Sequence, residues 1–504
     1  MRKLSLASVA VLALLLTGCA GGSGSSGETD APKAATLRLA ATSSNNSFDT
    51  SQLQTGNLVQ YWQPVYDTLL LLDTDAKLQP NLATEWEYDD TNTTLTLTLR
   101  DDVTFTDGEK FDAAAVKANM EHLRDGGGSN SSMLASVSGI EVVDDTHVAV
   151  TLTEPDPGLT NYLTTVAGAM ASPAALTGES IATEPVGSGP YVFDASKSVA
   201  GATYVYERND DYWNADAFPY DGLTITVMEE TTARLNALRS GEIDGALLDA
   251  KSATQAESAG LTLNVHRLDW QGLILADRDG SKNPALADVR VRQAINHAFD
   301  RETFVEKVLL TRGLASTQIF NEQSAAFLAE LDERYPYDPK KAKQLLADAG
   351  HPDGITIDMP SMPAFAATND IIEQQLADIG VTVNWTKVTA ESYIPTVQTG
   401  DYATFVMQLS SGNEWRDVYK SVSPAGPWNP RHSTTPEIAA LIDAAVAATS
   451  EDEYVDTLHQ INEYIVENAW FAPIAFADTI YATRSGTSVT PQPQNVVPAI
   501  RNYS

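Results

Sequence analysis

The chain has 504 residues, of which 43% are hydrophobic, and a formal charge of −35 from 67 acidic and 32 basic residues. Such a charge repels nucleic-acid phosphates and anionic lipid headgroups, so we expect neither as a ligand. Cys19 is the only cysteine, which excludes an internal disulfide, a CxxC redox pair and a cysteine-ligated zinc site. A chain of this length is expected to form more than one lobe.

The N-terminal region has the features of an export signal followed by a tether. Two basic residues precede an apolar run at residues 4–16, which is short for a permanent membrane span. The run ends in Leu-Thr-Gly before Cys19 and resembles a bacterial lipobox. We therefore expect residues 1–18 to be a signal peptide and residues 19–35 a flexible tether, with a lipidated Cys19 that holds the protein at the outer face of the cell membrane. The alternative is an ordinary signal peptide with an incidental cysteine.

The first predicted elements after the tether are strands. Residues 36–41 predict a first strand, and the alternating leucines at 95, 97 and 99 predict a half-buried one. Residues 142–152 read as a hairpin that turns at two consecutive aspartates.

Helices with clear ends follow. Asp338 can cap a helix whose first turn takes Pro339 and which ends at Gly350. A second helix from about residue 369 stops at a glycine and continues into a strand, which is typical of an α/β module. Four further helices and a late strand are predicted, at residues 291–299, 300–309, 438–447, 454–465 and 474–481.

The chain shows almost no signature of reactive chemistry. Its seven histidines are scattered without metal-ligand spacing, and it has no GxSxG elbow, no phosphate-binding loop and no dinucleotide-binding fingerprint. The stretch at residues 187–190 superficially matches a nucleophile loop, but Pro190 would obstruct the helix that such a loop needs. We therefore predict a non-enzyme without a cofactor, a metal site or catalytic residues.

A series of motifs in order gives the strongest functional signal. Together they resemble the extracellular solute-binding proteins of family 5, the peptide/nickel-binding class that serves ABC importers. The motifs lie at residues 66–70, 78–86, 99–108, 111–116, 185–191, 208–213, 237–244, 289–295 and 338–350.

This resemblance implies the fold: α/β, with two lobes of the periplasmic-binding-protein-like type II (cluster C) class and an extra inserted domain. Two crossover segments, near residues 266–271 and 468–475, would join the lobes and act as hinges. The implied divisions are lobe I at residues 36–66, 184–268 and 475–504, the inserted domain at 67–183, and lobe II at 269–474.

The resemblance also implies a function. The protein would be the substrate-binding lipoprotein of an ABC importer, a monomer that captures a small solute, most simply an oligopeptide, and delivers it to the permease subunits. The open alternatives are a non-peptide solute such as an oligosaccharide or a nickel chelate, and an exported receptor or hydrolase.

One loop is the first candidate for ligand binding. Peptide binders of this family often carry an aspartate in a Trp-x-Gly-Asp-like loop of the second lobe, which pairs with the amino terminus of the ligand. Here Asn413 stands at the expected position, and Glu414 or Asp417 would substitute after a small shift. Arg416 beside Asp417 is either a ligand contact or half of a surface ion pair.

Aromatic and amide side chains complete the predicted site. Trp415 and Trp428 flank a loop rich in Gly, Pro and Ser, where they would stack on a ligand or close a small hydrophobic cluster. Further candidates follow the first predicted strand or lie at a presumed hinge: Asn45, Asn46, Tyr61, Trp62 and Trp270.

Overall fold

The computed structural model describes residues 36–178, 180–448, 450–492 and 494–504. The predicted signal peptide, Cys19 and the tether therefore lie outside the described residues. None of the described helices is long and apolar enough to cross a bilayer.

The largest sheet is mixed and has nine strands, ordered β16-β12-β17-β11-β1-β10-β9-β8, with β13 paired to β17. β1 is parallel to β10 and β11, and the other pairs are antiparallel. The predicted first strand is thus confirmed as β1. In sheet order the bounds are β16 Thr404–Ser410, β12 Thr262–Leu275, β17 Phe471–Thr483, β11 Gly245–Leu248, β1 Leu37–Ala41, β10 Gly222–Val227, β9 Thr203–Arg208 and β8 Tyr191–Phe193, with β13 at Gly313–Ala315.

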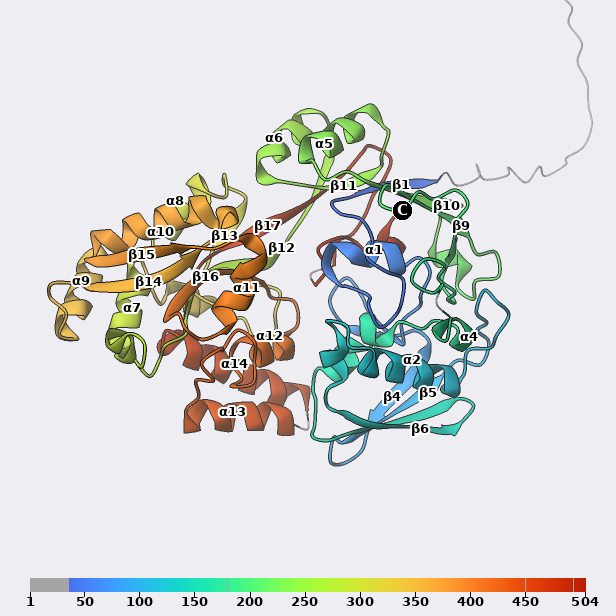
Figure 1. Ribbon diagram of the computed structural model, residues 1–504, viewed down its shortest axis with the longest axis horizontal. Helices are drawn as coiled ribbons and strands as arrows, with labels where there is room; N and C mark the ends of the chain where they lie inside the picture. The colour runs from blue at the N-terminus through green and yellow to red at the C-terminus, as the bar shows by residue number, and fades with distance from the viewer. Residues whose placement is uncertain (1–35, 179, 449, 493) are drawn as a thin grey trace, which may run out of the picture. The chain divides into compact units, whose positions relative to one another are not determined.

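Two long strands connect the two ends of this sheet. β12 and β17 have 14 and 13 residues, and they run from the side of β11 to the side of β16 and β13 (Figure 1). Their register shifts between Arg267 and Asp269 and again between Gln271 and Gly272. Both predicted crossover segments overlap this ladder, and a break in register is where a paired ribbon bends most readily.

A separate four-stranded antiparallel sheet is formed by residues that lie between β1 and β8 in the sequence. Its order is β4-β5-β7-β6, and α2 packs against it. The leucines at 95, 97 and 99 are all buried in β5, and β6 and β7 form the predicted hairpin, so both predictions are confirmed. The bounds are β4 Ala83–Tyr88, β5 Thr94–Leu99, β6 Val137–Asp144, β7 His147–Leu152 and α2 Ala113–Asp125; nearby short elements are α1 Val59–Trp62, β2 Leu70–Leu72, β3 Leu78–Pro80, α3 Leu159–Tyr162 and α4 Pro173–Leu176.

The helices of the second half begin and end as their caps predict. The Asp338 carboxylate accepts from the backbone N–H of Lys340 and Lys341 at the start of α9, and Gly350 after its end has a φ of +91°. α10, Gly380 and β15 form the predicted helix-glycine-strand unit, with β15 parallel to β14. The bounds are α5 Thr231–Ser240, α6 Ala250–Ser258, α7 Val289–Ala298, α8 Arg301–Lys307, α9 Pro339–Asp348, β14 Ile355–Ser361, α10 Ala366–Asp378, β15 Val381–Lys387, α11 Ala390–Gln398, α12 Glu414–Ser421, α13 Pro436–Ala447 and α14 Glu451–Glu467.

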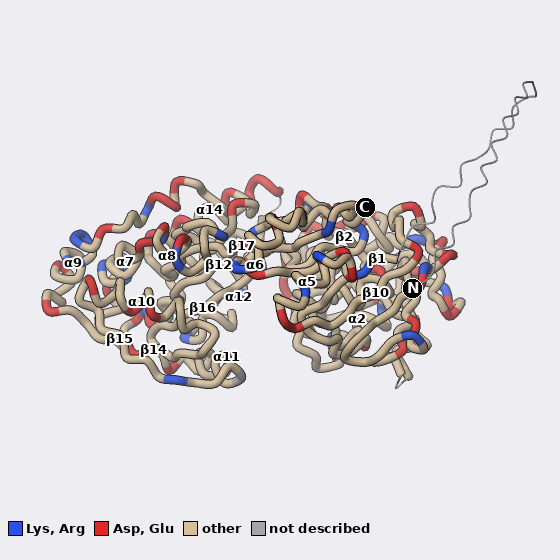
Figure 2. Tube along the Cα trace, turned by 90° about the horizontal axis from the view of Figure 1, so that it is seen from above, with Lys and Arg blue, Asp and Glu red and all other residues tan. Residues whose placement is uncertain are grey.

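Two large hydrophobic clusters and one small one make the core. The first takes its residues from β1 to β10 in the sequence together with the C-terminal segment, and the second from β12 to β17. The first cluster contains residues of both the predicted lobe I and the predicted insert, so the boundaries at 67 and 183 stay a prediction. Acidic residues lie along most of the described trace (Figure 2).

Candidate functional site

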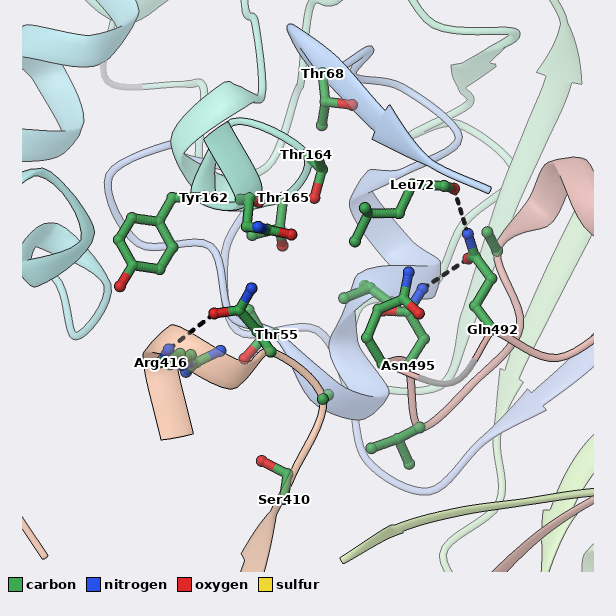
Figure 3. Close-up of a pocket in the computed structure, with 18 of the residues that line it drawn as sticks. Thr55, Thr68, Leu72, Tyr162, Thr164, Thr165, Ser410, Arg416, Gln492 and Asn495 are labelled. Atoms are coloured by element: carbon green, nitrogen blue, oxygen red, sulfur yellow. Dashed lines mark hydrogen bonds between the residues drawn. The ribbon is translucent and has the colours of Figure 1, made fainter. Parts of the chain in front are cut away.

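A cavity of about 200 Å³ lies where three parts of the chain meet. One water molecule needs roughly 10–15 Å³, so the cavity has room for a small organic solute. One wall comes from residues 55–72 and 161–165, a second from residues 410–420, and a third from residues 492–501. Figure 3 shows Arg416 of α12 on one side of this space and Gln492 and Asn495 of the C-terminal segment on another.

The wall from α12 begins with a helix cap. The Asn413 side chain accepts a 2.8 Å hydrogen bond from the backbone N–H of Arg416, so its carbonyl oxygen is committed to the helix. Gly412 precedes it, and a Cβ there would come within 3.1 Å of the Cα of Gln494. The glycine therefore allows the wall from α12 to approach the C-terminal segment closely.

Two of the four charged side chains on α12 pair with each other. The Asp417 carboxylate is buried, and it accepts from the Lys420 ammonium at 2.5 Å. Burial raises the pKa of Asp417, and the charge of Lys420 opposes that rise. Lys420 also donates to the backbone oxygen of Ser410. Arg416 differs, because its guanidinium is exposed and makes no hydrogen bond or ion pair to any described residue.

The wall from the first half is polar but uncharged. Besides backbone groups it offers hydroxyl and amide side chains, and several of these are held by internal bonds: the Tyr66 hydroxyl donates to Phe48 O and the Thr164 hydroxyl to Asn161 O. The Gln63 side-chain oxygen is buried and has no partner among the described residues. The uncharged polar residues of this wall are Thr55, Gln63, Tyr66, Thr68, Asn161, Tyr162, Thr164 and Thr165.

The C-terminal segment contributes a second group of amides. Gln492 donates to Leu72 O at 2.7 Å and accepts from the Asn495 side chain at 2.8 Å, so its own position is determined by two bonds (Figure 3). The backbone oxygen of Asn495 accepts from His266 of β12 at 2.7 Å. Gln494 is different, since both its side-chain oxygen and nitrogen are buried without a partner in the described part of the chain.

Arg501 supplies a positive charge at the end of the same segment. It lines the cavity, and its guanidinium makes no hydrogen bond or ion pair to the part of the chain that the structure describes. Burial lowers the pKa of Arg501, and the nearby Tyr212 and Asp67 oppose that effect. Asp67 is itself occupied, because it accepts from Ser188, Tyr212 and Trp213 at 3.0, 2.8 and 3.1 Å.

The structure brings three of the predicted ligand-binding residues to the cavity: Asn413, Arg416 and Asp417. Two other residues of the predicted loop lie on α12 but face elsewhere. The Glu414 carboxylate accepts from the Ser324 hydroxyl and the Ala325 N–H, and Trp415 is buried in the second cluster. The assignment of Glu414 and Trp415 as ligand contacts stays a prediction, because neither residue lines the cavity.

The other aromatic and amide candidates also lie outside the cavity lining. Tyr61, Trp62 and Trp270 are at most 1% exposed, and they pack in the two large clusters because their rings are the largest apolar surfaces nearby. The Tyr61 hydroxyl and the Trp62 indole N–H donate to the backbone oxygens of Ser43 and Gln54. Their polar groups are therefore used inside the protein.

The last three candidates are peripheral. Asn46 is exposed and donates to Gln52 O, while Asn45 and the Trp428 ring are partly buried away from the cavity. Their assignment as ligand contacts stays a prediction.

The C-terminal wall was missed entirely by the sequence analysis. Its one sequence signal is the cluster of amides between prolines at residues 491–498, which is unusual for an apolar strand and its following turn. Arg501 gives no local signal, because its role depends on which distant segments surround it. Among the described residues no group of three or more His, Cys, Asp or Glu side chains is placed to hold a metal ion.

Comparison with known proteins agrees with the motif series. Residues 77–425 match the model of the bacterial extracellular solute-binding proteins, family 5 Middle. The glutathione-binding protein GsiB of Salmonella paratyphi A is 30% identical over 334 residues, which are 64% of this chain and 64% of that protein. The match thus spans less than two thirds of the length of this relative.

Solved structures agree with the fold. HbpA2 from Haemophilus parasuis superposes with a TM-score of 0.83 at 21% identity, over 93% of this chain and 99% of that one. NikA from Brucella suis, in complex with Fe(III)-EDTA, gives 0.79 at 22% identity, over 93% and 99%. These likenesses confirm the predicted two-lobed α/β fold. With a family model that covers most of its length, the chain belongs to the bacterial extracellular solute-binding proteins of family 5.

Proposed function

We propose that this protein is the solute-binding component of an ABC importer and that it holds a small peptide-like solute in the cavity between α12 and the C-terminal segment. The observation that supports this most directly is the composition of the cavity, which is lined by amides, hydroxyls and two arginines whose guanidinium groups bond to none of the described residues. Such groups suit the carbonyl, N–H and carboxylate groups of a short peptide. The name of the matched relative, a glutathione-binding protein, points to the same class.

Capture would proceed by closure about the β12–β17 ribbon. α12 follows β16, whereas the facing walls come from residues before β12 and after β17. The Trp415 ring lies against Gly158, where a Cβ would come within 3.0 Å of its Cδ1 atom. We assign this contact to the closed form. A solute can favour that form only through contacts that the open form lacks.

Binding by the purified full chain tests the proposal. We would measure thermal shift and calorimetric binding with glutathione, di- and tripeptides, oligosaccharides and nickel chelates, and recover each bound compound for mass spectrometry. We expect saturable binding of a peptide-like solute that is recovered unchanged. Binding of sugars or chelates alone would favour a non-peptide cargo, recovery of a cleaved compound would favour a hydrolase, and no binding in any class would overturn the proposal.

We further propose that Cys19 carries the lipid anchor and that the protein delivers its solute to membrane-embedded permease subunits. The apolar run before Cys19 and the family membership support this. In cells fed an alkyne-labelled fatty acid, we expect the wild type to be labelled and to sediment with membranes. Cys19→Ser should lose both properties, and a labelled Cys19→Ser protein would contradict the assignment.

A further inference from the structure

The cavity has the opposite charge balance from the rest of the chain. Acidic residues outnumber basic ones by 67 to 32 overall, and Figure 2 shows them along most of the trace. The described cavity lining instead contains Arg416, Lys420 and Arg501 against a single acid, Asp417. Because Asp417 is paired with Lys420, neither arginine has a bonded acid in the described lining. Their field favours an anionic solute.

Arg501 is the more constrained of these two charges. A guanidinium that loses water needs a carboxylate or a set of oxygen acceptors to offset the desolvation. Two buried arginines elsewhere meet this need: Arg292 and Arg301 donate to backbone oxygens at 2.7–3.2 Å. Arg501 has no such acceptor among the described residues, although burial lowers its pKa. An acceptor supplied by the solute would complete its bonding.

Gln494 provides the second unpaired group. Its carboxamide can donate twice and accept twice, yet both of its polar atoms are buried and no described residue bonds to them. The neighbouring Gln492 and Asn495 bond to each other and to Leu72, so the segment is ordered independently of Gln494. A carboxamide pairs best with another amide, since each offers one N–H and one carbonyl oxygen to the other.

The cavity offers no free carboxylate for an ammonium group. Asp417 is the one acid of the described lining, and its charge is already paired with the Lys420 ammonium, although its Oδ2 atom is buried without a partner among the described residues. Asn413 occupies the position where an aspartate was expected from the sequence. Asp67, near Arg501, already accepts from three donors and is not part of the lining. An amino terminus on the solute would therefore have to share Asp417 with Lys420 and would have no carboxylate of its own.

We infer that the cavity selects a small solute with a carboxylate and an amide, that Arg501 binds the carboxylate and Gln494 the amide, and that a free amino group is not required. This inference rests on the proposed function, because it names the chemistry of the solute held in the same cavity. It differs from the sequence-based expectation of a carboxylate that pairs with the amino terminus of a peptide.

The test uses di- and tripeptides, including glutathione, each in three forms: unmodified, with the C-terminal carboxylate converted to an amide, and N-acetylated. Calorimetry on the wild-type full chain should show that the C-terminal amide binds about 10- to 100-fold more weakly, as expected for a lost charge-assisted hydrogen bond. The N-acetylated form should bind within about threefold of the unmodified peptide, since no paired charge is lost. This comparison needs no variant and so is independent of folding.

Variants then assign the residues. Arg501→Met should bind the acid and the amide equally, and Arg501→Lys should keep part of the preference because it keeps the charge. Gln494→Met should weaken both forms by a similar factor, about tenfold for a lost buried bond. Arg290→Met is the matched control: it removes an arginine that is exposed and paired with Asp288, far from the lining residues in the sequence and outside the cavity. It should leave all affinities unchanged.

The outcomes separate the two proposals. If peptides bind but the acid and amide forms bind equally, if Arg501→Met keeps the preference, or if N-acetylation abolishes binding, the inference is overturned and the proposed function remains. If the only solute that binds lacks a carboxylate, the inference is likewise overturned. If no solute of any class binds, the proposed function fails and the inference fails with it.

Discussion

Two regions of the molecule treat arginine in opposite ways. Around α7 and α8, Arg292 and Arg301 are 6% and 7% exposed, and their guanidinium groups bond to backbone oxygens from several separate segments. In the C-terminal segment, Arg501 lines the cavity without a bonded partner among the described residues. The first arrangement joins segments of the fold, and the second leaves a charge available to something outside the chain.

The difference shows how a structural charge can be told from a functional one. Burial lowers the pKa of the arginines in both regions, and it lowers the pKa of Arg301 to about 10. The direction of the pKa shift by itself therefore does not separate them. The number of bonded acceptors does, because a saturated guanidinium has no donor left for a ligand. Each prediction below tests one side of this contrast.

The largest effect is expected at Arg301. Replacement by Met removes the buried donors to oxygens of Asn296, Tyr335, Ser316 and Pro473. We expect the free energy of unfolding to fall by about 3–5 kcal/mol, measured by urea denaturation. Arg501→Met in the ligand-free protein should lower the stability much less, because it removes no hydrogen bond to a described residue and only the longer-range attraction to Asp67. If Arg301→Met and Arg501→Met lower the free energy of unfolding equally, the proposed difference between the two regions is wrong.

A smaller effect is expected where α12 meets residue 158. A Cβ on Gly158 would come within 2.6 Å of the Tyr162 hydroxyl oxygen and 3.0 Å of the Trp415 ring. Gly158→Ala should cost about 1–2 kcal/mol of closure energy, which is a roughly tenfold loss of affinity. Gly139→Ala is the control, since its Cβ would meet nothing nearer than 3.9 Å. If Gly158→Ala leaves the affinity unchanged, the contact between Trp415 and residue 158 is not part of the closed form.

Each region also contains a buried histidine, His266 beside the C-terminal segment and His297 on α7. Burial lowers the pKa of both, and each bonds to a backbone oxygen, of Asn495 and Pro336 respectively. The unfolded chain takes up these protons near the ordinary value of 6.5, whereas the folded chain takes them up only at lower pH. Stability is therefore present above pH 6.5 and is lost as the pH falls below it.

The slope per histidine cannot exceed roughly 1.4 kcal/mol per pH unit. His266→Gln and His297→Gln should each flatten the decline of the unfolding free energy between pH 6.5 and 5. Only His266→Gln should also change solute affinity, because only His266 bonds to a residue that lines the cavity. An equal effect of the two changes on affinity would contradict the assignment of the C-terminal segment to the site.

The smallest effect is expected at Arg290, which pairs with Asp288 on the surface. Exposed pairs of this kind contribute little to stability. Arg290→Met should leave the melting temperature and the affinity unchanged, which makes it a control for both regions. Arg290 also donates to the Asp348 backbone oxygen at 2.8 Å, but this bond is exposed to water as well. A measurable loss would mean that exposed arginine bonds near α7 contribute to the stability of the fold.

Local features of the fold followed directly from the sequence. The cap at Asp338, the glycine after α10, the alternating leucines of β5 and the hairpin turn at residues 144–145 depend on near neighbours, and all are as predicted. The family followed from motifs that recur in order along the chain. Within the site, α12 was found because its loop stands at a position known from the family, and three of its residues line the cavity.

The tertiary structure alone decided which aromatic rings are core and which amides face the cavity. Tyr61, Trp62 and Trp270 are residue types that often contact ligands, but their rings pack inside the hydrophobic clusters. Nothing in the local sequence distinguishes an aromatic residue that faces the core from one that faces the cavity. Gln494 and Arg501 became site residues only when the C-terminal segment returned beside α12 and β2, some 80 and 420 residues away in the sequence. Helix caps and hydrophobic periodicity depend on residues a few positions apart in the sequence. A buried polar group is left unpaired only when no segment of the chain supplies a partner, and this depends on the whole tertiary structure.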